Sequence, residues 1–301
     1  MTEKRPIFSI KSTLRGLLPA GLRRQIRGVV HRDRLHAYWC KDSANWGDTL
    51  NPVLIGMLSG KRARFSSDPE VVKYLVIGST LDRADAQTEV WGAGFIGPNL
   101  ATRQRPKAIH AVRGGLTRDR LQELGLPAPE VYGDPALLLP LFFNPAIEPL
   151  FEIGVIPHYT DRGHPLLAHW SQEADRVKII DVGMDIFDFV RAVKSCRMIL
   201  SSSLHGLICA DAYGIPNSWC RLGGEIIGGN FKYHDYFSGV GRELIEPTVV
   251  TRERDWDLAV SRCWNHGIQF DPKHLLNACP FRSAQSPATG AGEVHGSRVT
   301  E

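Results

Sequence analysis

The segment Ser201–Gly206 combines residue types that could bind an anion. It follows an apolar run and precedes an apolar stretch of small residues that ends at a glycine. This order predicts a strand, a turn and a helix. The free N–H groups at a helix start favour anions, the hydroxyls of Ser202 and Ser203 add donors, and His205 adds a group that titrates near neutral pH. The segment therefore predicts an anion site where open α/β sheets bind ligands, at a strand's carboxyl end.

An acid and an arginine stand at similar junctions. Asp48 lies in a glycine turn within Asn45–Pro52, ahead of an expected helix. It fits either a helix N-cap or a carboxylate that acts as a base, and local sequence alone favours the cap. Arg113 ends an apolar strand and is followed by two glycines and a helix start. Its guanidinium could point into a crevice and bind phosphate or carboxylate with two N–H groups, or it could pair with Asp119 or Asp134.

Two further patterns predict no site. Gly92, Gly94 and Gly97 have the spacing of a dinucleotide-binding fingerprint, but no helix is expected after them, and that site requires one. We therefore interpret the segment as a strand-to-loop turn. The nearby histidines of the second half lack carboxylates at ligand-like spacing, so no metal site is predicted. These histidines are His158, His164 and His169.

Expected strands and helices follow one another in turn along the chain, and the candidate residues lie where they join. Apolar runs predict buried parallel strands, and helical patterns follow several of them. This alternation predicts an α/β fold with parallel sheets, and two prolines in 144–149 favour a linker. We expect a basic N-terminal arm at 1–35, a Rossmann-like domain at 36–146, a second at 150–280 and a disordered tail at 281–301. The expected strands are 36–40, 74–78, 90–91, 108–112, 153–156, 177–182 and 197–200, and the expected helices begin near 53, 117, 186 and 205.

Composition and charge narrow the class of protein. No stretch approaches the roughly 20 apolar residues of a membrane span, and the six cysteines follow no disulfide pattern, which favours a reducing cytoplasm. The net charge is +4, yet residues 1–36 hold nine Lys or Arg against two acids, a local charge of +7. This arm is either a solvated extension or a peripheral contact with an anionic membrane surface.

Six short motifs occur in one order along the chain. They are Asn45–Asp48, Ala111–Gly114, Val131–Pro135, Ile156–Tyr159, Ser201–Gly206 and Lys232–Tyr236. Together they resemble the polysaccharide pyruvyl transferases, in particular the branch that decorates bacterial exopolysaccharides such as xanthan and succinoglycan. The resemblance covers roughly residues 36–240.

The resemblance implies two Rossmann-like domains facing across a cleft, as in GT-B glycosyltransferases. It implies phosphoenolpyruvate as donor, a lipid-linked oligosaccharide or polysaccharide as acceptor, and a pyruvate ketal and phosphate as products, with no metal, further cofactor or nucleic acid. The family's essential acid, arginine and histidine map onto Asp48, Arg113 and His205. Asp48 is the candidate base, and His205 is either a general acid or a ligand of the donor. Further candidates for substrate binding are Asn45, His158, Ser202, Ser203 and Lys232.

Two other functions remain open. A GT-B glycosyltransferase that uses a nucleotide sugar would share the fold, and a polysaccharide-assembly subunit could keep the fold without catalysis. For the transferase we expect a cytoplasmic location, with the arm as a peripheral contact on the inner face of the membrane.

Overall fold

Two five-stranded sheets form the framework of the protein. The computed structural model describes residues 33–41, 44–223 and 227–283. The strand orders are β2-β1-β3-β4-β5 and β10-β9-β8-β6-β7, and every neighbouring pair is parallel. This confirms the α/β fold with parallel sheets. The strands are β1 (Arg34–Tyr38), β2 (Arg62–Phe65), β3 (Lys73–Leu75), β4 (Thr88–Trp91), β5 (Ala108–Ala111), β6 (Phe151–Ile156), β7 (Val177–Ile179), β8 (Cys196–Ser201), β9 (Asn217–Arg221) and β10 (Thr248–Val249).

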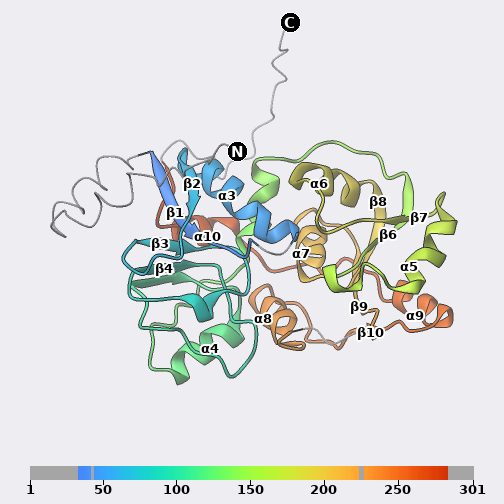
Figure 1. The fold of residues 1–301 in the computed structure, drawn as a ribbon. Coiled ribbons are helices and arrows are strands. Elements are labelled where there is room, and N and C mark those ends of the chain that lie inside the picture. Colours follow the sequence, from blue (N-terminus) through green and yellow to red (C-terminus); the bar gives the residue numbers. More distant parts are fainter. Residues whose placement is uncertain (1–32, 42–43, 224–226, 284–301) are drawn as a thin grey trace, which may run out of the picture.

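Helices connect the strands and surround the two sheets (Figure 1). Short 3-10 turns supplement them at η2 (Leu81–Arg83), η3 (Pro135–Leu141), η4 (Tyr159–Asp161), η5 (Ser171–Glu173) and η6 (Glu253–Asp255). The α-helices are α3 (Trp46–Ser59), α4 (Gly115–Glu123), α5 (Pro165–Trp170), α6 (Ile186–Lys194), α7 (Leu204–Ala212), α8 (Phe231–Gly239), α9 (Trp256–Ser261) and α10 (Pro272–Asn277).

Helix α3 begins earlier than expected and contains a proline. The sequence predicts its start after Pro52, yet it starts at Trp46. A proline inside a helix removes the N–H that would bond the carbonyl four residues before it, here that of Asp48. The Asn51 side-chain amide donates to this carbonyl at 3.2 Å and also exchanges hydrogen bonds with the backbone of Ile77, after β3. Asn51 thus compensates for the proline and fixes the first turn of α3 to the first sheet.

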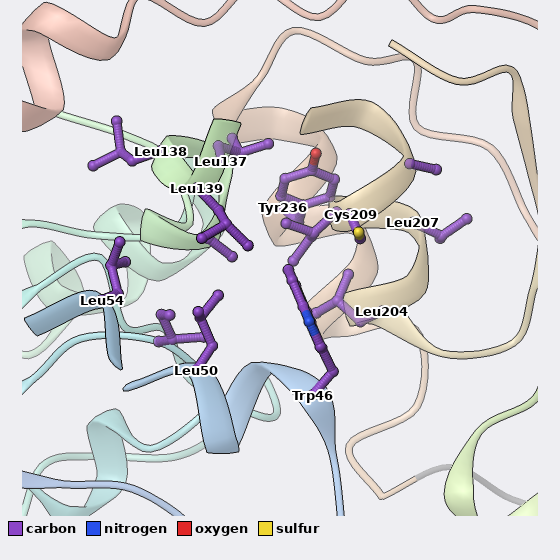
Figure 2. Close-up of a cluster of buried hydrophobic side chains, with 14 of the residues drawn as sticks. Trp46, Leu50, Leu54, Leu137, Leu138, Leu139, Leu204, Leu207, Cys209 and Tyr236 are labelled. Carbon is purple, nitrogen blue, oxygen red and sulfur yellow. The ribbon is translucent and has the colours of Figure 1, made fainter. Parts of the chain in front are cut away.

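A shared hydrophobic core joins the two halves of the chain. Side chains of α3 and η3 pack against side chains of α7 and α8 (Figure 2). The Trp46 indole also donates a hydrogen bond across this contact to the carbonyl of Ile186, at 3.1 Å. The halves are therefore in direct apolar contact here. The cleft between two GT-B-like domains and the division near 146–150 remain predictions. The residues of the contact include Trp46, Leu50, Leu54, Leu137, Leu138, Leu139, Leu204, Leu207 and Tyr236.

The C-terminal part of the chain returns to the first sheet, where α10 lies (Figure 1). The Trp91 indole donates to the carbonyl of Leu275 in α10 at 2.9 Å. The Phe281 ring packs against those of Tyr74 and Trp91, with centroids 4.8 and 5.5 Å apart. A tail beginning at 281 was thus expected too early, because one aromatic residue anchors a segment of otherwise low hydrophobicity. Residues 284–301 and residues 1–32 of the arm lie outside the described residues.

Candidate functional site

The first sheet places three candidate side chains near its carboxyl edge, where α/β sheets bind ligands. Asp48 lies in the first turn of α3, which follows β1. Arg113 follows β5. Asp134 follows the segment at 131–132, in which Tyr132 forms a single parallel bridge with Val112. Asp48 is not the helix cap that local sequence favoured, because Asn45 takes that place and accepts from the N–H of Gly47.

The second half contributes two histidines and a lysine. His158 follows β6, and His205 lies in the first turn of α7, after the neighbouring strand β8. Lys232 comes from the first turn of α8. Electrostatic interactions link Lys232 to both Arg113 and Asp48, and link His205 to Arg113. The structure thus brings the three mapped residues, together with His158 and Lys232, into one polar cluster.

His205 is held by the start of α3. Its Nδ1 lies 3.0 Å from Oδ1 of Asn45, the oxygen that accepts from the N–H of Gly47. Because that oxygen is an acceptor, we assign the ring proton to Nδ1 and the lone pair to Nε2. Nε2 is buried and has no hydrogen-bond partner among the described residues. A Cβ at Gly47 would lie 2.2 Å from Nε2, so glycine is required for this approach.

Both histidines of the cluster are neutral at physiological pH. Burial, with smaller effects from Lys232 and Arg113, lowers the pKa of His205 to about 3. Burial and Lys232 lower the pKa of His158 to about 4. A bound anion would offset the neighbouring cations and favour protonation of the rings. His205 therefore offers an acceptor in the free protein and becomes a donor at Nε2 only when a ligand raises its pKa.

Lys232 is the partly buried cation of the cluster. Burial and the nearby Arg113 lower its pKa to about 8, while Asp48 opposes the shift. It is therefore still mostly protonated at pH 7. Together with the guanidinium it supplies two positive charges on opposite halves of the chain.

Arg113 is fully buried and makes three hydrogen bonds. Its Nε donates to Asp235 of α8 at 2.9 Å, and its Nη atoms donate to Ser79 Oγ and the carbonyl of Phe95, both at 2.6 Å. Its ion-pair partner is therefore neither Asp119 nor Asp134, and its guanidinium is not the exposed fork that the sequence suggested. The two Nη atoms each keep one N–H without an acceptor in the described part of the chain.

Glycines allow other chain segments to approach Arg113. A Cβ at Gly94 would lie 2.7 Å from the guanidinium, and one at Gly114 would lie 1.6 Å from the carbonyl oxygen of Asp235. Gly239 in α8 approaches the Arg113 carbonyl in the same way. No helix follows Gly92–Gly97, which confirms that this segment is a turn. Sequence reasoning missed Asp235 and the role of these glycines. The signal available was their position beside Arg113 and in the Lys232–Tyr236 motif.

The serines before His205 mainly organise the chain. Ser202 Oγ accepts from the N–H of His158 and donates to Asp161, both at 2.8 Å, so it fixes the loop that carries His158. Ser203 is the N-cap of α7, but its side chain makes no capping hydrogen bond. Neither serine is shown to contact a ligand, and both remain candidates for substrate binding.

Within the described ranges, no group of three or more His, Cys, Asp or Glu side chains could hold a metal ion. None of the helices in these ranges is long and apolar enough to cross a membrane.

Comparison with known proteins adds independent information. A family model described as polysaccharide pyruvyl transferase matches residues 65–221. An uncharacterised protein of Acanthamoeba polyphaga mimivirus is 30% identical over 225 residues, or 71% of this chain and 77% of that protein. The succinoglycan biosynthesis protein ExoV of Rhizobium meliloti is 28% identical over 219 residues, or 68% of this chain and 64% of ExoV. A solved structure of a functionally uncharacterised protein from Klebsiella pneumoniae is 10% identical, with a TM-score of 0.40, and covers 78% of this chain and 100% of that one.

Proposed function

Because this chain belongs to the polysaccharide pyruvyl transferase family, we propose that it transfers pyruvate from phosphoenolpyruvate to a sugar of an exopolysaccharide repeat unit. The products are a pyruvate ketal and phosphate. The similarity to a succinoglycan biosynthesis protein supports the class of acceptor. The observation that carries the proposal is the cluster in which Arg113 and Lys232 lie near the carboxylate of Asp48 and the neutral ring of His205.

The cations and the helix start suit the donor. Phosphoenolpyruvate carries a phosphate and a carboxylate on one small carbon skeleton, so its site requires concentrated positive charge. Arg113 and Lys232 provide two cations, and the first turn of α7 adds backbone N–H groups and the positive end of a helix dipole. Groups that are fixed before the reaction stabilise developing charge without reorganisation.

The carboxylate and the imidazole suit the acceptor chemistry. Ketal formation requires a proton at C3 of the donor, attack of a sugar hydroxyl on C2, loss of phosphate, and ring closure by a second hydroxyl. Asp48 acts as the base for the attacking hydroxyl. His205 binds the donor, because the anionic donor raises the pKa of the neutral ring and favours its protonated form.

The substitution Asp48→Asn tests this assignment. Asn45 caps α3, so the cap is unchanged by the substitution. We expect sugar-dependent phosphate release to fall by about 10²–10⁴-fold, the usual contribution of a general base, with similar phosphoenolpyruvate binding and melting temperature. The matched control is Asp188→Asn, which changes an exposed first-turn acid of α6. Full activity of Asp48→Asn would remove Asp48 as the base. Sugar-dependent release of a nucleotide, instead of phosphate, would indicate a glycosyltransferase.

A further inference from the structure

Asp134 is a buried carboxyl group with an unusual set of contacts. Its side chain is fully buried. Oδ1 accepts from the N–H of Ala136 at 2.9 Å and thereby caps η3. Oδ2 is buried and has no hydrogen-bond partner anywhere in the described ranges. Buried carboxylates are normally paired or fully hydrogen-bonded, so one oxygen without a partner indicates a group that carries a proton or meets a ligand.

The backbone holds Asp134 beside the cluster. The N–H of Val112 donates to the carbonyl of Val131, and the N–H of Gly133 donates back to the carbonyl of Val112, at 3.0 and 3.1 Å. These bonds hold the segment 131–133, just before Asp134, beside Val112, just before Arg113. The charged or titratable groups that interact with the Asp134 carboxyl are Arg113 after β5, Asp48 of α3 and Tyr236 of α8.

In these surroundings a large fraction of the Asp134 carboxyl is protonated near neutral pH. Burial raises its pKa to about 7, and Asp48 adds to the rise. The Ala136 N–H and Arg113 act in the opposite direction. A group with a pKa close to the working pH is well suited to general acid catalysis, because it holds the proton and can also release it.

Helix capping alone does not explain these features. Asp271 also caps a helix, α10, is also followed by a proline, and also accepts from the N–H two residues later, at 2.9 Å. That carboxyl is exposed. A capping aspartate in this chain therefore has no need of burial, and the burial of Asp134 beside two catalytic candidates requires another reason.

We propose that Asp134 is the acid that protonates C3 of phosphoenolpyruvate, an assignment that rests on the proposed function. The O–H bond of Asp134 breaks, and the C2=C3 electron pair forms the new C3–H bond. The positive charge at C2 is shared with its phosphate-bearing oxygen, and the oxygen of a sugar hydroxyl attacks C2.

The remaining steps balance the protons. The C2–O bond to phosphate breaks, and its electron pair leaves with phosphate. The second hydroxyl then bonds to C2 and closes the ring. Of the two hydroxyl protons, one departs on phosphate and the other restores the Asp134 carboxyl. Asp48 is placed to take this proton first, because the two carboxyls interact.

Asp134→Asn and Asp134→Ser keep a capping oxygen and remove the acid. We expect phosphate release with de-pyruvylated succinoglycan oligosaccharide to fall by about 10²–10⁴-fold in both, with phosphoenolpyruvate affinity within about threefold of wild type, since the donor cations remain. The wild-type rate should decline as pH rises through about 7, whereas the residual rate of the variants should decline only near pH 8, where Lys232 loses its proton. The matched control, Asp271→Asn, should keep both the rate and the pH profile.

The possible results distinguish a failure of the Asp134 assignment from a failure of the proposed function. If wild-type protein releases no sugar-dependent phosphate, the proposed function fails and Asp134 fails with it. If wild type is active but the variants stay within about threefold of its rate and keep its pH profile, only the Asp134 assignment is overturned. Should neither variant fold, the wild-type profile decides: a rate that stays level from about pH 6 to about pH 7.5 and declines only near pH 8, with Lys232, overturns the assignment.

Discussion

The neutral state of His205 makes the protein sensitive to acid. Its pKa is lowered to about 3 in the folded state, against about 6.5 when unfolded. The contribution of the neutral His205 ring to the free energy of unfolding is therefore complete above about pH 6.5 and is lost as pH falls toward 3. We expect wild type to lose about 2–3 kcal/mol more than His205→Gln between pH 7.5 and 4.5, measured by urea unfolding. Equal losses in the two proteins would show that the ring is not held neutral.

Asp134 has the opposite pH dependence. Its pKa is raised to about 7 in the folded state, against about 3.9 unfolded. Its favourable contribution is therefore present below about pH 4 and is lost as pH rises through 7. Between pH 5 and 8, Asp134→Asn should lose less stability than wild type, by about 2–3 kcal/mol. Parallel stability curves from denaturant titrations would contradict the raised pKa.

At the scale of elements, α8 is attached to the first half through Arg113. Asp235 of α8 accepts from Arg113 and from both the N–H and the hydroxyl of Thr117, at 2.7–2.9 Å. Lysine keeps the charge of Arg113, but its single ammonium nitrogen cannot span the three acceptors that the guanidinium reaches from three separate nitrogens.

We therefore expect Arg113→Lys to weaken phosphoenolpyruvate binding and also to lower the free energy of unfolding, by roughly 2–4 kcal/mol. Calorimetric titration and denaturant unfolding measure the two effects. The exposed Arg176→Lys, at a surface ion pair, is the control. Weaker binding with unchanged stability would show that the Arg113–Asp235 contact does not hold α8.

The sequence was sufficient to predict the elements that rest on local pattern. The apolar runs identified most strands of both parallel sheets but missed β2, β9 and β10. The helices α6 and α7 begin within a residue of the expected positions. The start of α3 was missed because a side chain, Asn51, compensates for Pro52. Asn51 also exchanges hydrogen bonds with the backbone of Ile77, 26 residues away in the sequence, and this contact leaves no local signal.

The sequence predicted which residues form the site, but not their burial, their pairing or their pKa values. Asp48, Arg113 and His205 were identified by motif, and the structure places them in one cluster. The pairing of the buried Arg113 with Asp235 arises where α8 meets the first half of the chain, and the raised pKa of Asp134 arises from its burial beside Asp48. Arg113 and Asp235 are 122 residues apart in the sequence, so their pairing leaves no signal in the local sequence.

At the scale of the whole molecule, the basic arm offers a test of membrane contact. The proposed acceptor is built on a lipid carrier, and the +7 arm could bind an anionic surface at about 1 kcal/mol per well-placed basic residue. Deleting residues 1–32, which ends before β1, should leave turnover on a soluble acceptor intact. Binding to vesicles of phosphatidylglycerol and phosphatidylcholine should fall at low salt. Equal vesicle binding by the full-length and truncated proteins would show that the arm does not contact the membrane.

The proposed activity is the transfer of pyruvate from phosphoenolpyruvate to a sugar. The most direct measurement incubates the full chain with phosphoenolpyruvate and oligosaccharides of succinoglycan and xanthan whose ketals have been removed by mild acid. Phosphate is assayed, and the sugars are analysed by mass spectrometry and NMR. We expect sugar-dependent phosphate release with an equal amount of pyruvate ketal on the oligosaccharide. Phosphate release without any pyruvate on the sugar, or no reaction with either oligosaccharide, would contradict it.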